Sequence, residues 1–95
     1  MKNMLHEAQK LQAKLMEELK KIRVEGSAGG GMIRIEMDGE QNVLAVHIEQ
    51  DIFEEKDKSM LEDLILAAFS DAKKKVSEKT KESFKTITGF PIPTL

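Results

Sequence analysis

Lysine side chains at helical spacing are the residues of this chain that most clearly suggest a ligand. There are thirteen lysines but only two arginines, Arg23 and Arg34. A lysine ammonium is a flexible point charge that suits phosphate, whereas arginine dominates the bidentate reading of guanine. If nucleic acid is the ligand, this composition favours contact with the backbone of a duplex and weak sequence preference. Trp and Tyr are absent, so a stacking platform for single strands is not expected.

The cationic side chains are gathered at the two ends of the sequence. Residues 1–23 hold six cations and three acids, residues 24–72 hold three cations and twelve acids, and residues 73–95 hold six lysines and two glutamates. The formal net charge of −2 therefore hides two basic segments around an acidic middle. A lysine-rich helix face is often only solvated, so the charge pattern alone leaves both interpretations open.

No constellation of residues indicates catalysis, a metal or a cofactor. The two histidines, His6 and His47, fall on different predicted elements, and the chain has no cysteine. The triplet Gly29–Gly31 lacks the GxGxxG or GxxxxGK[ST] pattern and precedes a strand instead of a helix, so a flexible connection is favoured over a phosphate loop. The carboxylates Glu54, Glu55 and Asp57 alternate with lysines and are interpreted as solvated loop charge. We therefore expect no enzyme.

The first element that positions these lysines is a helix over residues 2–22. Apolar residues recur at three- and four-residue steps from Met4 to Ile22, and no Gly or Pro interrupts them. At 100° per residue, Lys10, Lys14 and Lys21 fall within about 40° of one another. The pattern predicts an amphipathic helix with one basic side.

Three short strands are predicted next, over residues 23–28, 32–37 and 43–49. The alternation of Ile33, Ile35 and Met37 gives the middle strand one apolar face, and Asp38-Gly39 indicates a tight turn. The returning strand has Leu44, Val46 and Ile48 on one face, with His47 on the other. Such a small antiparallel sheet needs a helix over its apolar side.

A second long helix is predicted over residues 59–88. Ser59 and Glu62 match a capping box at its start, and Gly89 is expected to cap its end ahead of a short tail, 89–95. Roughly 30 helical residues span about 45 Å, which is longer than the sheet, so the helix is expected to project beyond the core. Its lysines Lys74, Lys81 and Lys85 share one face.

These elements predict one α+β domain over residues 1–95, in the order α-β-β-β-α. Two long helices and one small sheet leave an apolar stripe that a monomer would expose, so a two-fold dimer is expected. The segment at Met1–Lys10 lacks the apolar run of a signal peptide, and no segment is suited to cross a bilayer. We expect a cytoplasmic protein.

The chain resembles the YbaB/EbfC family of small nucleoid-associated proteins along nearly its whole length. The resemblance rests on MLHEAQKLQAKLMEEL, GSAGGGMIRIEMDG, VLAVHIE and MLEDLILAAFSDAKKKV, and on the tail GFPIP. Asp51-Ile52 departs from the Asp-Pro that opens this loop in many relatives, which bears on loop geometry. The resemblance implies a tweezer-like homodimer that binds double-stranded DNA, is associated with the bacterial nucleoid, and affects its organisation and gene expression.

The resemblance also implies which lysines contact DNA, on the first helix and on the second long helix. These residues are Lys10, Lys14, Lys20, Lys21, Lys73, Lys74, Lys75, Lys79, Lys81 and Lys85. Both groups of lysines are diluted by nearby glutamates, Glu17, Glu18, Glu78 and Glu82. The rival interpretation is a protein-interaction or chaperone-like scaffold that holds an unidentified protein partner with its projecting helices and methionine-rich surfaces.

Overall fold

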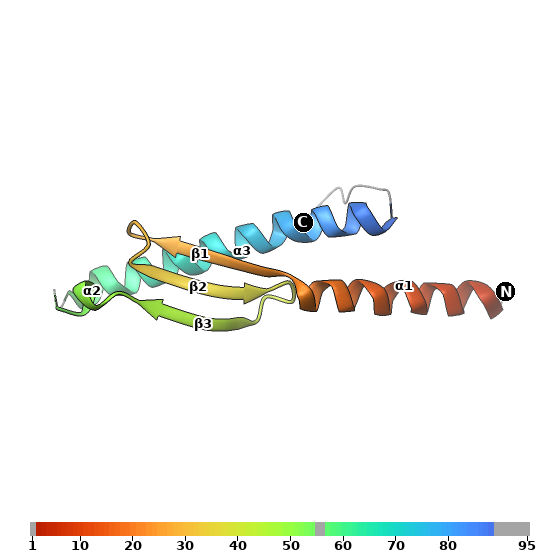
Figure 1. Ribbon diagram of the computed structural model, residues 1–95, viewed down its shortest axis with the longest axis horizontal. Helices are drawn as coiled ribbons and strands as arrows, with labels where there is room; N and C mark the ends of the chain where they lie inside the picture. The colour runs from red at the N-terminus through yellow and green to blue at the C-terminus, as the bar shows by residue number, and fades with distance from the viewer. Residues whose placement is uncertain (1, 55–56, 89–95) are drawn as a thin grey trace.

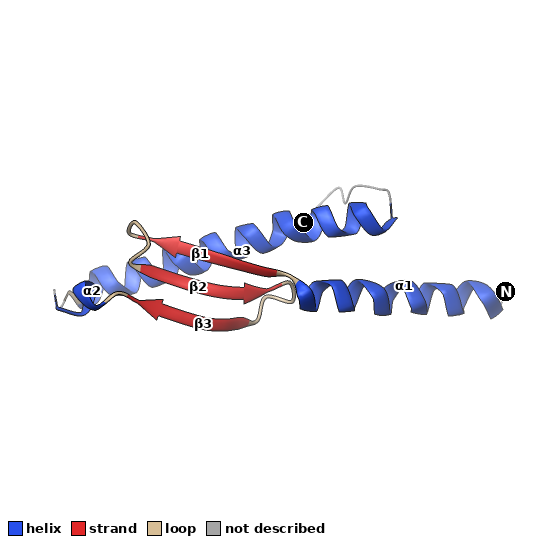
Figure 2. Ribbon diagram, in the orientation of Figure 1, coloured by secondary structure: helices blue, strands red, loops and turns tan. Residues whose placement is uncertain are grey.

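In chain order, three antiparallel strands follow one long helix and precede another, as Figures 1 and 2 show. The computed structural model describes residues 2–54 and 57–88; the predicted cap at Gly89 and the tail lie outside the described residues. The α-β-β-β-α order is confirmed, with one extra short helix. The elements are α1 (Lys2–Lys21), β1 (Arg23–Ala28), β2 (Ile33–Asp38), β3 (Val43–Ile48), α2 (Gln50–Glu54) and α3 (Lys58–Thr88).

The molecule is long and narrow, measuring 63 × 22 × 17 Å. The sheet has the order β1-β2-β3 with both neighbouring pairs antiparallel. Helix α3 crosses one face of the sheet against β1 and β2, and α1 leaves the sheet at the start of β1 (Figure 1). Both α1 and the C-terminal part of α3 extend beyond the same end of the sheet. The expected projection of the second long helix is therefore confirmed.

The hydrophobic core lies between β2 and α3. From β2, Ile33, Ile35 and Met37 are buried, as the alternating pattern predicts, and they meet a face of α3 that consists largely of small residues. The small side chains let the helix come close to the sheet. The approach is close at Gly26 of β1, where a Cβ atom would stand 2.3 Å from the Ala68 oxygen and 2.3 Å from the Ala72 nitrogen.

Helix α2 is an element that the sequence interpretation missed. We predicted a loop after residue 49, but residues 50–54 form a helical turn that inserts Ile52, only 2% exposed, into the core. Five residues are too few to display a helical period, which explains the miss. The apolar Ile52 within an acidic segment was the sequence feature that could have indicated a buried turn.

The start of α3 also differs from the prediction. The helix begins at Lys58, and Asp57 is its N-cap: the main-chain N–H of Met60 donates to Asp57 Oδ1 at 3.0 Å. The predicted capping box is therefore wrong, because Ser59 already lies inside the first turn. An aspartate is as good an N-cap as serine and also places negative charge at the positive end of the helix.

Strand β3 differs from its prediction in both alternation and burial. A β-bulge separates the pair Glu36–Ala45 from the pair Met37–Val43, so Leu44 is the extra residue. Leu44 and Val46 remain about half exposed, because α3 packs against β1 and β2 and leaves the edge strand uncovered. His47 lies opposite Arg34 on the other face, as expected.

The loop between β2 and β3 is organised by one aspartate. Asp38 Oδ1 accepts hydrogen bonds from the main-chain N–H groups of Glu40 (2.9 Å) and Asn42 (3.0 Å), and Oδ2 accepts one from the Asn42 amide (3.1 Å). These bonds, led by the Asn42 main-chain N–H, hold the pKa of Asp38 below its usual range. Gly39 donates to the Leu19 carbonyl at 2.9 Å, which ties this loop to the end of α1.

Replacing Gly26 by alanine is expected to destabilise the fold by about 1–3 kcal/mol, because the new methyl group must push α3 away from β1. Chemical denaturation followed by circular dichroism measures this free energy of unfolding. Ser27→Ala is the matched control, since Ser27 is exposed and contributes only its main-chain N–H to α3. Equal stability of the two variants would contradict the close contact.

Candidate nucleic-acid interface

The predicted lysines stand on the two helices that project from one end of the sheet (Figure 1). Every residue of α1 from 3 to 14 is exposed, so this helix presents its side chains on all sides. All ten predicted lysines are exposed as well. The lysines of α1 stand on a projecting helix, whereas those of α3 begin beside β1, where Lys75 contacts the strand, and continue onto the projecting end.

The ammonium groups of three of the ten lysines interact with neighbouring groups, and the strength of the interaction differs among them. Lys21 Nζ lies 3.5 Å from Glu18 Oε1, a contact between exposed side chains that contributes little. Lys73 Nζ lies 5.9 Å from the centre of the Phe69 ring, at the outer limit of a cation–π contact. Lys75 is the most strongly engaged, as described next. The other seven form no hydrogen bond or ion pair through their side chains within the part of the chain that the structure describes.

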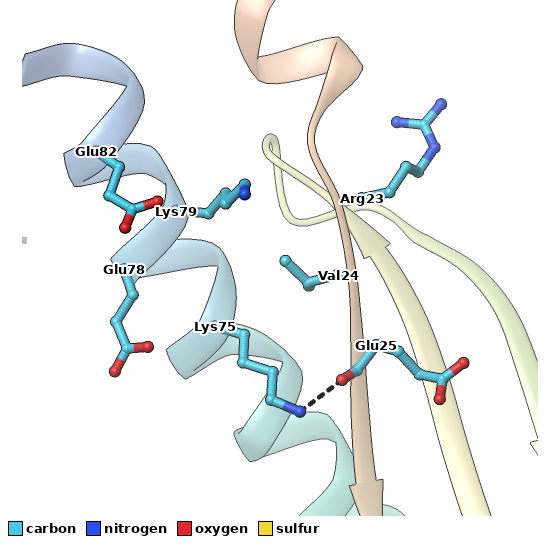
Figure 3. A pocket seen from close by; sticks show the side chains of 7 residues that line it. All are labelled: Arg23, Val24, Glu25, Lys75, Glu78, Lys79 and Glu82. Atoms are coloured by element: carbon cyan, nitrogen blue, oxygen red, sulfur yellow. Dashed lines mark hydrogen bonds between the residues drawn. The ribbon is translucent and has the colours of Figure 1, made fainter. Parts of the chain in front are cut away.

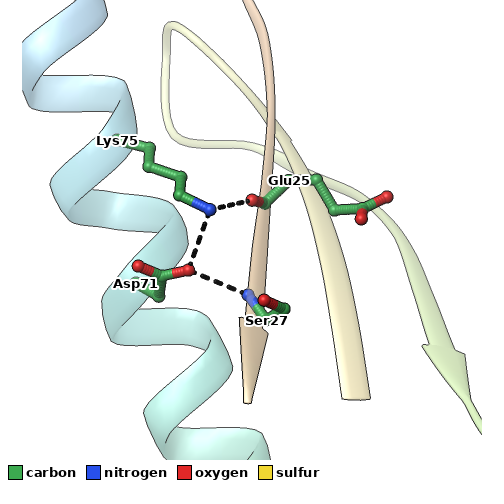
Figure 4. A network of polar contacts seen from close by, with 4 residues as sticks. All are labelled: Glu25, Ser27, Asp71 and Lys75. Atoms are coloured by element: carbon green, nitrogen blue, oxygen red, sulfur yellow. Dashed lines mark hydrogen bonds and ion pairs between the residues drawn. The ribbon is translucent and has the colours of Figure 1, made fainter. Parts of the chain in front are cut away.

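Lys75 helps to attach α3 to the edge of β1 (Figure 4). Its Nζ donates to the Glu25 carbonyl at 2.8 Å and lies 3.1 Å from Asp71 Oδ2, which also accepts the main-chain N–H of Ser27 at 3.0 Å. The Ser27 N–H, with the Lys75 ammonium, holds the pKa of Asp71 below its usual range. A lysine held in this way is already paired, which gives Lys75 a structural role that the lysine count alone did not indicate.

Arg23 has a comparable structural role at the end of α1. Its Nη1 donates to the carbonyls of Lys20 (2.6 Å) and Ile22 (2.9 Å), which lack intrahelical partners at a helix C-terminus. The sequence interpretation counted Arg23 in the basic charge of the first segment and placed it at the start of the first strand, without a capping role. Its position directly after the last predicted turn was the signal for a cap.

An open hollow of ≈ 420 Å³ lies between β1 and α3 (Figure 3). Acidic and basic side chains alternate around it, and Lys75 is already engaged there. Lys79 extends from α3 toward the strand in this view, and the Glu82 carboxylate lies on the same side of the helix as Lys79. Such a balanced rim offers no concentrated charge for a small anion. The residues around the hollow are Arg23, Val24, Glu25, Lys75, Glu78, Lys79 and Glu82.

Charge is separated along the length of the molecule. The C-terminal half of α3, from beside β1 to its projecting end, carries six lysines and two glutamates between residues 73 and 88. The opposite end, around α2 and the start of α3, carries the acids Asp51, Asp57, Glu62 and Asp63. An anionic partner is therefore attracted to the helix end and repelled from the α2 end.

The described residues show neither a metal-binding group nor a membrane-spanning helix. Within residues 2–54 and 57–88, no three histidine or acidic side chains are grouped so as to hold a metal ion. None of the described helices combines the length and the apolar content that a membrane crossing requires. His47 Nε2 lies 3.7 Å from Glu36 Oε2 on the exposed face of the sheet, without a third ligand.

The fold is that of a small α+β protein with two basic helices that extend from one end of a three-stranded sheet. The profile of the YbaB/EbfC DNA-binding family matches residues 1–90, and the chain belongs to this family, whose members are DNA-binding proteins and not enzymes.

A solved structure has the same fold. The crystal structure of an uncharacterized protein from Helicobacter pylori, HP0035, is 24% identical in sequence to this chain and superposes with a TM-score of 0.75. The match covers 90% of each chain. It supports the arrangement of the helices and the sheet.

Lys75 and its neighbour Lys74 are expected to have different effects when replaced by alanine. Lys75→Ala should lower the free energy of unfolding by about 1 kcal/mol, because the Glu25 carbonyl and Asp71 lose their partner. Lys74→Ala should leave stability within about 0.5 kcal/mol and weaken DNA binding instead. Denaturation and duplex titration of both variants separate the two roles, and equal stability losses would contradict this assignment.

Proposed function

We propose that the protein binds double-stranded DNA as a homodimer, mainly through lysine–phosphate contacts with weak sequence preference. It does so as a cytoplasmic, nucleoid-associated protein that helps to organise the bacterial nucleoid and to regulate genes. Family membership supports the DNA-binding role. The observation that supports this mode is the set of seven exposed lysines without side-chain partners among the described residues, on helices that project from one end.

Phosphate contact fits these lysines better than base reading does. Single ammonium groups on exposed helices can follow the duplex backbone, but they lack the forked geometry that guanine recognition uses. Both arginines are unsuited to a projecting base contact: Arg23 caps α1, and Arg34 lies in the middle strand of the sheet. We therefore expect the affinity to depend on salt more than on sequence.

The homodimer is supported by apolar surface that one protomer leaves uncovered. Along α1, Met4 is 75% exposed and Leu5 is 67% exposed, and Leu11 and Met16 continue the same apolar side. A helix without tertiary contacts is marginally stable in water, so α1 needs a partner for its apolar side. A second copy supplies one at a two-fold axis.

The same exposed methionines and leucines support the alternative function, a scaffold that holds another protein. Methionine side chains adapt to varied surfaces, and α1 offers them on an accessible helix. Apolar binding changes little with salt, whereas phosphate binding weakens steeply. Salt dependence therefore distinguishes the two functions.

Binding to a labelled mixed-sequence duplex should weaken steeply as salt rises from about 50 to 200 mM, with log K falling about 0.9 per neutralised phosphate. Fluorescence anisotropy at three salt concentrations measures the slope. An unrelated duplex of equal length serves as the control for sequence preference and should bind within a few fold. Absence of binding at the lowest salt would overturn the proposal, and a flat salt dependence would favour the scaffold.

Charge reversal of the shared lysine face, Lys74→Glu with Lys81→Glu and Lys85→Glu, should abolish duplex retention and leave the fold intact, because all three side chains are exposed. Lys81→Glu alone should reduce affinity. Its matched control is Lys58→Glu, an exposed reversal on the same helix at the acidic end, which should bind nearly as the parent does. Circular dichroism verifies folding. Unchanged binding by the triple variant would remove α3 from the interface.

A further inference from the structure

Helix α1 is held to the rest of the protomer at its C-terminal end. Among its described side chains, only Leu15, Glu18 and Leu19 are partly buried, and the other residues from 3 to 21 are exposed. Ile22, which joins α1 to β1, is 6% exposed. At about 1.5 Å of rise per residue, Lys10 lies about 17 Å from this end, so a tilt of about 20° moves it by about 6 Å. The attachment of the last turn therefore decides where the lysines of α1 lie.

The last turn of α1 is bonded to the loop of residues 39–42, between β2 and β3. The Gly39 N–H donates to the Leu19 carbonyl at 2.9 Å. The backbones also touch, because a Cβ atom at Gly39 would stand 2.4 Å from the same oxygen. Arg23 bonds only to the nearby carbonyls of Lys20 and Ile22, whereas the Gly39 contact joins α1 to a distant part of the chain. A change in the shape of the loop is therefore transmitted to α1.

The shape of this loop depends on the Asp38 carboxylate. It accepts the main-chain N–H groups of Glu40 at 2.9 Å and Asn42 at 3.0 Å, and the Asn42 amide at 3.1 Å. Between these two residues, Gln41 has a φ of 67°, a left-handed conformation that is uncommon outside glycine. The bonds on both sides hold Gln41 in this conformation. Without the carboxylate, we expect Gln41 to relax to a negative φ and the loop to change shape.

Helix α3 gives α1 less support at the same place. A cavity of ≈ 260 Å³ lies where the last turn of α1, the loop and α3 meet. Thr80 of α3 lines it, and its buried Oγ1 has no hydrogen-bond partner within residues 2–54 and 57–88. This unfilled space leaves room for α1 to tilt, so packing against α3 constrains its direction less than the loop does. The cavity is lined by Leu19, Gly39, Glu40, Gln41, Val76, Ser77 and Thr80.

We propose that Asp38 is a positioning residue for DNA binding, which sets the direction of α1 through the loop of residues 39–42. The proposal rests on the proposed function, in which lysines of α1 and of α3 contact one duplex. The direction of α1 fixes the distance between these two groups, and with it the number of lysines that reach phosphates together. Asp38 is an anion and only 8% exposed, so it acts through Leu19 and not by touching DNA.

The distance between the two projecting helices tests the proposal directly. Spin labels are attached at Glu7→Cys on α1 and Glu82→Cys on α3, both exposed positions in a chain without native cysteine. Double electron–electron resonance is recorded with an excess of unlabelled chain, so that the distance within one chain is measured. Asp38→Ala should shift this distance by about 5 Å or more. Asp38→Asn should retain it, because the amide oxygen still accepts both main-chain N–H groups.

Two further variants separate the loop contact from a general loss of stability. Gly39→Ala keeps the carboxylate but pushes the Leu19 carbonyl away, so it should also displace α1. Ile33→Val is the matched control, since it truncates a fully buried side chain at the other end of β2 and should leave the distance unchanged. A parental distance in both Asp38→Ala and Gly39→Ala would overturn the proposal.

Duplex titration in two backgrounds shows whether Asp38 acts through α1. Asp38→Ala should weaken binding about fivefold in the parent, and Asp38→Asn should restore it. In a chain with Lys10→Gln and Lys14→Gln, Asp38→Ala should change affinity by less than about twofold, because a misplaced α1 no longer matters. Ile33→Val should bind as the parent does. Equal losses in the two backgrounds would overturn the proposal. A parent that binds no duplex would overturn the proposed function instead, and the distances still decide whether Asp38 positions α1.

Discussion

The close contact of β1 with α3 at Gly26 is the constraint on which the rest of this structure depends. A 31-residue helix approaches the strand so closely that a methyl group has no room there. The helix is consequently centred on β1 and β2, where its small side chains allow it to pack close to the sheet. Its side chains Asp71 and Lys75 bond to the β1 backbone. The uncovered β3, the attachment of α3 to the β1 edge and the direction of the projecting helix follow from this position.

Sequence periodicity predicted most of the elements because each of them is long enough to display its own pattern. The two-residue alternation of Ile33, Ile35 and Met37 identified the buried face of β2, and the bounds of α1 and α3 were predicted within a residue. Helix α2 was missed because a single turn has no measurable period. Ser59 was chosen as the N-cap because the motif fits it, yet the neighbouring Asp57 supplies the same chemistry.

The predicted interface shows a different limit of prediction from sequence. Composition and helical spacing identified the exposed basic faces, but they do not report which ammonium groups are already paired. Lys74 and Lys75 are adjacent in the sequence, and only tertiary packing places Lys75 against the Glu25 carbonyl, 50 residues away. The bulge at Leu44 and the half-exposed Val46 likewise depend on where α3 crosses the sheet. Such features follow from long-range geometry, which a local pattern does not encode.

The separation of charge along a 63 Å molecule has a consequence for how a complex forms. A protein with acidic and basic ends has a large dipole moment, and the field of a polyanion exerts a torque on that dipole before contact. In the proposed binding mode, the molecule is therefore turned with its helices toward the duplex during diffusion, which raises the fraction of encounters that are productive. A net charge of −2 then limits unspecific accumulation on other anionic surfaces while the oriented approach is retained.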